Sequence, residues 1–148
     1  MPDVRRTLLN PLDAVRRRVT KGLEVAVADP RVRRGGQLRA TVTLEDPARL
    51  GVLAVGLVCT EYYEELASAV VTPGSGVLAR PMVSAVAFEV WQPLDAVAGE
   101  QEITLHVPGG VPFSYAGAKL TYRWEVAVRG ERSGRLDAQA RHEIVVLP

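Results

Sequence analysis

The chain has 148 residues, of which 47% are hydrophobic and 24% are charged, and its formal net charge is +1. This length and composition suit one globular domain with a single core, and they argue against general disorder. No apolar run approaches the ~20 residues of a membrane-spanning helix, and the apolar stretch at residues 7–9 is too short for a secretory signal. We therefore expect a protein that is neither secreted nor inserted into a membrane.

Positive charge is concentrated in the first part of the chain. Residues 1–39 contain ten Lys and Arg against four Asp and Glu, whereas the other residues contain eight against thirteen. The two parts therefore carry net charges of +6 and −5. Either the first part has an anionic partner, or it lies against the acidic remainder of its own domain.

Residues 1–22 are expected to form a basic helical segment that precedes a domain at residues 23–148. Asn10 and Pro11 are suited to the start of a helix, and Gly22 is suited to its end. A helix of about ten residues is marginal in isolation. Its apolar stripe should therefore dock on another surface, which we expect to be the domain itself.

From residue 23 onward the hydrophobic pattern changes to period two, which is typical of half-buried β-strands. The predicted strands cover residues 23–28, 38–45, 52–59, 86–91, 102–107, 119–129 and 138–147. The third is apolar on both faces, which indicates a central strand, and residues 66–82 are interpreted as an insertion around a Pro-Gly loop. Seven strands separated by turns predict an all-β, immunoglobulin-like sandwich of about seven strands in two antiparallel sheets.

The alternation also predicts which side chains face the core. Val86, Phe88 and Val90 are expected to share one face of their strand, with Trp91 on the other face and pointing outward. Trp124 falls on the apolar face of its strand and is expected in the core.

Two turn motifs in this pattern resemble the arrestin family. The first is the strand, Gly-containing turn and strand at residues 27–42. The second is more specific: a strand that ends in Pro108, a Pro-x-Ser turn formed by residues 112–114, and a tyrosine-bearing strand that begins at Leu120. The resemblance covers residues 23–147, and bacterial sporulation-control proteins also resemble this family.

The resemblance implies an arrestin-like sandwich that acts as an adaptor or scaffold for other proteins, and in some members also binds phospholipid head groups. The chain departs from the family in two respects. It contains one sandwich where full arrestins contain two, and the basic segment at residues 1–22 has no counterpart in the pattern. The buried charged cluster by which arrestins sense phosphate is not identified, so recognition of phosphoproteins is not carried over.

Residue types that carry chemistry are scarce. Cys59, the single cysteine, has no disulfide partner and lies in an apolar run, so it is expected to be buried and inert in a reducing, cytoplasmic setting. His106, which is expected to face solvent, and His142 lack a local set of three or four metal ligands. The glutamates at residues 61–65 are interpreted as a solvated strand end. We predict no catalytic, cofactor or metal site, and therefore no enzyme.

The surface feature that the sequence marks for a partner is a set of basic residues. These are Arg16, Arg17, Arg18, Lys21, Arg31, Arg33 and Arg34. If the helix packs beside the first turn of the domain, they form one patch that could meet an anionic partner. A solvated face without a role is the competing interpretation. A carbohydrate platform is disfavoured because Trp91 is the one ring expected to point outward.

The sequence thus predicts a non-catalytic, protein-binding adaptor of arrestin-like type. The alternative is a membrane-surface or nucleic-acid-associated protein that acts through the basic helix, although specific nucleic-acid recognition would also require exposed aromatic residues or a groove-reading helix. An unpaired edge strand favours self-association, so we also expect a homodimer.

Overall fold

The structure is a computed structural model that describes residues 22–64, 70–71, 78–79, 82–131 and 138–148. The predicted helix within residues 1–22 and most of the predicted insertion at residues 66–82 lie outside these residues. The strands are β1 (Leu23–Val27), β2 (Arg31–Arg33), β3 (Gln37–Leu44), β4 (Leu53–Glu64), β5 (Val70–Val71), β6 (Leu78–Ala79), β7 (Met82–Pro93), β8 (Gly99–His106), β9 (Tyr115–Ala116), β10 (Leu120–Gly130) and β11 (Ala138–Leu147).

The all-β prediction is confirmed, but the count of about seven strands is too low. Eleven strands lie in the described part of the chain, together with a single 3₁₀ turn at Pro47–Arg49. The seven strands with five or more residues correspond to the seven predicted ones. The other four, β2, β5, β6 and β9, have two or three residues each, which is too short for a visible alternation.

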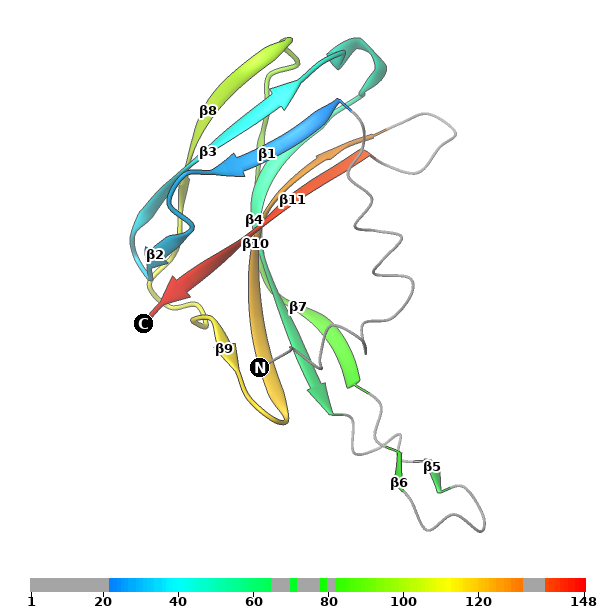
Figure 1. The fold of residues 1–148 in the computed structure, drawn as a ribbon, viewed down its shortest axis with the longest axis vertical. Helices are drawn as coiled ribbons and strands as arrows, with labels where there is room; N and C mark the ends of the chain where they lie inside the picture. Colours follow the sequence, from blue (N-terminus) through cyan, green and yellow to red (C-terminus); the bar gives the residue numbers. More distant parts are fainter. Residues whose placement is uncertain (1–21, 65–69, 72–77, 80–81, 132–137) are drawn as a thin grey trace.

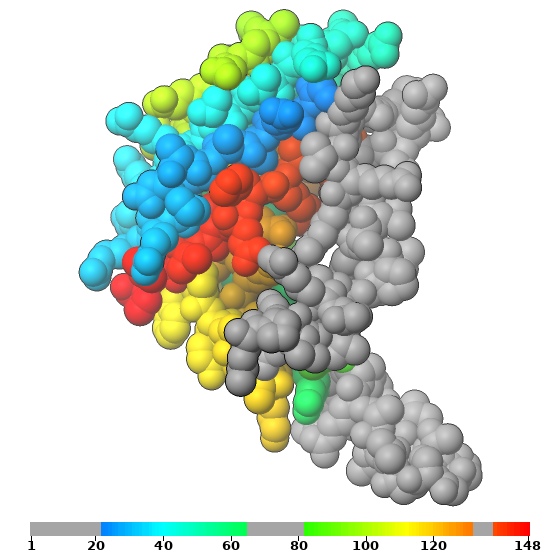
Figure 2. Space-filling model, in the orientation of Figure 1, coloured from blue at the N-terminus to red at the C-terminus, as the bar shows by residue number. Residues whose placement is uncertain are grey.

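Two sheets pack face to face as a β-sandwich (Figure 1). The larger sheet has the strand order β2-β11-β10-β4-β7, with β9 beside β10, and the smaller sheet has the order β1-β3-β8. β5 and β6 form a separate antiparallel pair. Figure 2 shows β1 of the small sheet and β11 of the large sheet side by side along one border of the sandwich.

One strand pairing differs from the predicted antiparallel arrangement. β2 runs parallel to β11, with Arg31 opposite Val145 and Arg33 opposite Leu147. The chain leaves the small sheet after β1 and joins the edge of the large sheet within a few residues, so β2 enters in the same direction as the last strand. β2 has only three residues, of which Val32 alone is buried, so the sequence pattern did not indicate that the chain passes from one sheet to the other here.

The core lies between the two sheets and has Trp124 as its largest fully buried side chain. The indole ring is 0% exposed and lies 5.7 Å from the ring of Phe88, measured between centroids. Its Nε1 donates a hydrogen bond to the backbone oxygen of Pro112 at 3.0 Å. The predicted inward facing of Trp124 is therefore confirmed, and its polar atom has the partner that a buried indole requires.

A β-bulge in β7 overturns part of the predicted facing. Cys59 of β4 lies opposite Phe88, whereas the next residue, Thr60, lies opposite Val86, so Ala87 has no counterpart. The extra residue moves Val86 to the face that carries Trp91, and Val86 is 56% exposed. The prediction that Val86 shares a face with Phe88 is wrong for this reason.

The Pro-x-Ser turn is attached to the last strand. β10 pairs with β11 only as far as Trp124 opposite Ile144. Beyond that point the N–H of Ser114 donates to the oxygen of Val146, and the N–H of Val146 donates to Oγ of Ser114, both at 2.8 Å. The turn thus lies beside β11 where β10 no longer pairs with it, and it satisfies the backbone N–H and C=O of Val146.

Replacing Trp124 tests the assignment of the core. Trp124→Ala should lower the free energy of unfolding by about 3–5 kcal/mol, because it leaves a cavity and removes the indole hydrogen bond. Urea denaturation measures this. Val52→Ala is the control, since Val52 is 71% exposed and should change stability little. Equal stability of the Trp124 variant and the parent would contradict the facing of all of β10.

Candidate functional site

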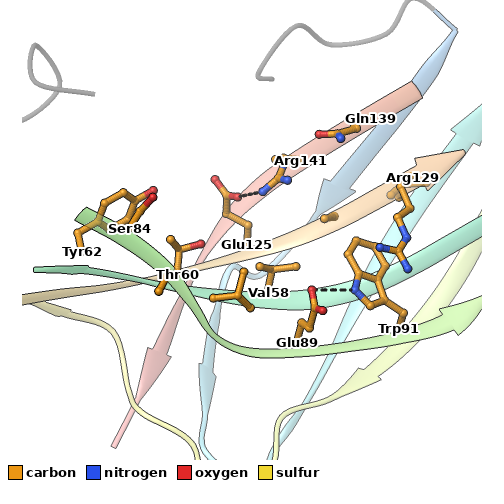
Figure 3. A pocket seen from close by; sticks show the side chains of 14 residues that line it. Val58, Thr60, Tyr62, Ser84, Glu89, Trp91, Glu125, Arg129, Gln139 and Arg141 are labelled. Carbon is orange, nitrogen blue, oxygen red and sulfur yellow. Dashed lines mark hydrogen bonds and ion pairs between the residues drawn. The ribbon is translucent and has the colours of Figure 1, made fainter. Parts of the chain in front are cut away.

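The outer face of the six-stranded sheet, which is the side turned away from the core, contains a hollow of about 300 Å³ (Figure 3). We call it the outer-face hollow. Residues of β4, β7, β10 and β11 line it, most of them at alternate positions, because neighbouring strands in register present the same face together. Its floor includes Val58, which is 5% exposed, and Tyr62 and Ser84 lie together at one end.

Trp91 and Arg129 form the other end of the hollow (Figure 3). The guanidinium carbon of Arg129 lies 4.0 Å from the ring centroid of Trp91, a cation–π contact. Nε1 of Trp91 donates to a carboxylate oxygen of Glu89 at 3.2 Å. The predicted outward facing of Trp91 is confirmed. Because a cation already covers a face of this ring, the ring does not offer the open platform that a sugar would need.

Gly56 makes the position of the Trp91 ring possible. A Cβ at residue 56 would lie 2.9 Å from two ring carbons of Trp91 and would collide with the backbone oxygen of Val90. Gly56 is buried in the middle of β4, directly opposite Trp91 of β7. The glycine therefore lets the indole lie close against the sheet.

Two ion pairs cross from β10 to β11 on the same face. Nη1 of Arg141 lies 2.8 Å from Oε2 of Glu125, and Nη2 of Arg123 lies 2.6 Å from Oε2 of Glu143. Burial tends to lower the pKa of Arg123, but the hydrogen bond to Glu143 and nearby carboxylates raise it overall, so the guanidinium stays charged. Four charges of this face are thus paired with one another across β10 and β11, whereas Arg129 and Glu89 contact Trp91.

The structure brings together only part of the predicted basic patch. Arg31 and Arg33 are both exposed and flank the buried Val32 on β2, so they point to the same side of the strand. Arg34 is directed elsewhere: its Nη1 donates to the oxygen of Val111 at 3.3 Å, and its guanidinium carbon lies 5.3 Å from the ring centroid of Phe113. The remaining members, Arg16, Arg17, Arg18 and Lys21, lie outside the described residues.

The residues considered for chemistry lie apart from the hollow or are buried. Cys59 is 0% exposed, and burial together with the charge of Glu61 raises the pKa of its thiol to about 11. Glu61 accepts a hydrogen bond of 3.4 Å from the hydroxyl of Tyr122, whose pKa is raised by burial and by this carboxylate. His106 is exposed, as predicted. Within the described ranges, no three His, Cys, Asp or Glu side chains are grouped to hold a metal ion.

The hollow itself was missed at the level of sequence. Its charged residues, such as Glu125 and Arg141, were visible only as polar positions of alternating strands. What makes them a site is the register, which places Arg141 opposite Ala127 and beside Glu125. A search for complementary charges on the two adjacent predicted strands could have suggested the pairing, but not the hollow.

Comparisons with known proteins show a likeness in structure and none in sequence. No family model matches the sequence, and no curated protein matches it. The chain is similar in structure to the sporulation control protein Spo0M from Bacillus subtilis, with 13% sequence identity and a TM-score of 0.49. The match covers 85% of this chain and 49% of that one, so the chain spans about half the length of Spo0M in that structure. In the part of the chain that is described, no helix is long and apolar enough to cross a membrane.

Adding a methyl group at Gly56 tests the geometry at Trp91. Gly56→Ala should lower the free energy of unfolding by about 1–3 kcal/mol, because the Cβ must displace both the Val90 carbonyl and the indole. Gly109→Ala is the matched control, since a Cβ there meets nothing within 4 Å. Urea denaturation of both variants measures the difference. A Gly56 variant as stable as the control would mean that Trp91 does not lie over this position.

Reactivity of the thiol tests the burial of Cys59. At about pH 8 the native protein should react with a thiol reagent such as DTNB only as fast as it unfolds, because the thiol is covered and protonated. In urea the reaction should be complete at once. Between about pH 9 and pH 11, the thiol of the unfolded chain has lost its proton while the buried native thiol keeps it. The free energy of unfolding should therefore fall as the pH rises through this range. Val97→Cys, at a position 57% exposed, is the control for rapid labelling, and equally rapid labelling of native Cys59 would contradict its burial.

Proposed function

We propose that this protein is a non-catalytic, arrestin-like adaptor that binds another protein at the outer-face hollow. The observation that carries the proposal is the composition of the hollow, whose lining combines Trp91, Tyr62, Arg129 and Arg141 with the apolar Val58 and Val86. Trp, Tyr and Arg are the residue types enriched at the energetically dominant centres of protein interfaces.

The side chains of the hollow are held in place before any partner arrives. Trp91 is fixed between Glu89 and Arg129, and Glu125, whose side chain is 13% exposed, is paired with Arg141. A partner that covers Glu125 and Arg141 therefore does not have to bury either charge unpaired, which would cost several kcal/mol. It also orders few side chains on this surface, which reduces the entropic cost of association.

The arrestin-like part of the proposal is supported by the turn motifs of the sequence. The Pro-x-Ser turn is attached through Pro112 to the core tryptophan and through Ser114 to the last strand. Proteins that resemble this family are adaptors and scaffolds, and the buried, unpaired Cys59 suits a reducing, cytoplasmic setting.

The alternative function, attachment to a membrane surface or nucleic acid through the basic segment, is favoured by one observation. Arg31 and Arg33 are exposed on the same side of β2, and no ion pair to either is found within the described residues. Binding of this kind is electrostatic and weakens steeply as salt is raised, whereas a protein interface with an apolar centre is much less affected.

Affinity capture from a lysate of the source cells distinguishes the two functions. The intact chain is compared with Tyr62→Ala/Trp91→Ala, which alters the hollow, and with Thr41→Ala/Thr104→Ala, which alters the outer face of the small sheet. Bound proteins are identified by mass spectrometry at about 0.05 and 0.5 M salt. We expect one discrete protein that is retained at both salt concentrations by the parent and the small-sheet variant, and that is lost from the hollow variant.

A charge-reversed variant provides the opposing result. Arg16→Glu/Arg17→Glu/Arg18→Glu keeps every residue of β4, β7, β10 and β11 that lines the hollow. If binding is lost only in this variant, and the captured material is lipid, nucleic acid or a salt-sensitive mixture, the adaptor function is wrong and the basic segment is the functional element.

A further inference from the structure

In the described part of the chain, four strands stand at the ends of the two sheets, and three of them are protected against pairing with another chain. β2 has three residues and exposes Arg31 and Arg33. β1 has five residues and exposes Glu24, and β8 exposes Glu100 and Glu102. Short length and charged side chains are the usual means by which natural sheets prevent edge-to-edge association.

β7 is the edge that lacks this protection. It is 12 residues long, Glu89 is its one charged residue, and no described strand pairs with it on the side away from β4. Its exposed side chains include Met82 at 45%, Val86 at 56% and Val90 at 44%. A long, exposed and apolar edge strand favours the addition of another strand.

The bulge at Ala87 divides this edge into two parts. Residues 82–86 form a regular segment without a charged side chain, whereas Glu89 lies beyond the bulge. Across Ala87 the side chains exchange faces, so a regular ladder with a new strand cannot continue through it. The pairing segment is therefore residues 82–86.

We propose that a second copy of this chain pairs with residues 82–86 in the antiparallel direction, with the two-fold axis at Ser84. In this register Met82 of one copy lies opposite Val86 of the other, and Val83 lies opposite Ala85, so each pair shares a face of the sheet. All five positions are uncharged, so no like charges face each other. The strand is thus complementary to itself, which is the requirement of a two-fold interface.

This arrangement has a consequence for the outer face. The two-fold axis of an antiparallel strand pair is perpendicular to the sheet, so both copies present the same face on the same side. The outer-face hollows of the two copies would then lie on one side of a continuous sheet, on either side of the seam. A ladder of five residues per copy is short, so the dimer is expected to dissociate on dilution.

Sedimentation velocity of the purified, full-length chain across the micromolar range tests the dimer. The parent should change from monomer to dimer as the concentration rises. Val86→Lys should remain monomeric, because a lysine then lies opposite Met82 of the other copy at each end of the paired segment, and a charged side chain opposes edge-to-edge pairing. Val97→Lys is the matched control, since Val97 is 57% exposed and lies outside β7, and it should dimerise like the parent. A parent that stays monomeric at all concentrations would overturn the proposal.

Cross-linking then tests the location of the axis. Ser84→Cys, treated with a short bis-maleimide, should give a covalent dimer, whereas Val97→Cys should not, and the native Cys59 is buried. A dimer that survives Val86→Lys and is not cross-linked through residue 84 would place the interface elsewhere and refute the proposal. Both measurements use the protein without a partner, so their outcome is independent of whether the hollow binds another protein.

Discussion

The position of Trp124 in β10 is the constraint on which most of this structure depends. The indole is fully buried, so it needs an apolar environment on every side and one acceptor for its N–H. β4 and β11, the neighbours of β10, supply part of that environment, and Pro112 supplies the acceptor from a separate turn. Because Ser114 in that same turn bonds to Val146, the core tryptophan, the turn and the last strand form one connected unit.

The inward facing of Trp124 also determines what the outer face can carry. In a strand of period two, fixing one residue in the core sends Glu125 and Arg129 to the opposite face. A slip of one residue would place these charges in the core, where an unpaired charge costs several kcal/mol, so the packing enforces the register. The paired charges of the outer-face hollow are therefore a consequence of the same constraint that builds the core.

This dependence explains what could be predicted from the sequence. Features that follow from the hydrophobic pattern within one strand were predictable, such as the burial of Trp124 and Cys59 and the exposure of His106. Features that depend on how two strands meet were not. The bulge at Ala87 has no signature in an alternating run, and the parallel contact of β2 with β11 involves too few residues to form a pattern. The ion pair of Arg141 with Glu125 likewise requires the register between strands that are separated by a turn.

The bulge is a single irregularity with two effects, and both bear on how the molecule presents itself. By adding one residue to β7, it moves Val86 to the face that already carries Trp91, and so it enlarges the apolar part of the outer-face hollow. It also ends the regular ladder that the free edge can offer, which limits any added strand to residues 82–86 and leaves Glu89 beyond the seam. A bulge in an exposed edge commonly serves to prevent association. Here it lies toward the middle of β7, so one uncharged half of the edge stays regular and the other half contributes Glu89 and Trp91 to the hollow.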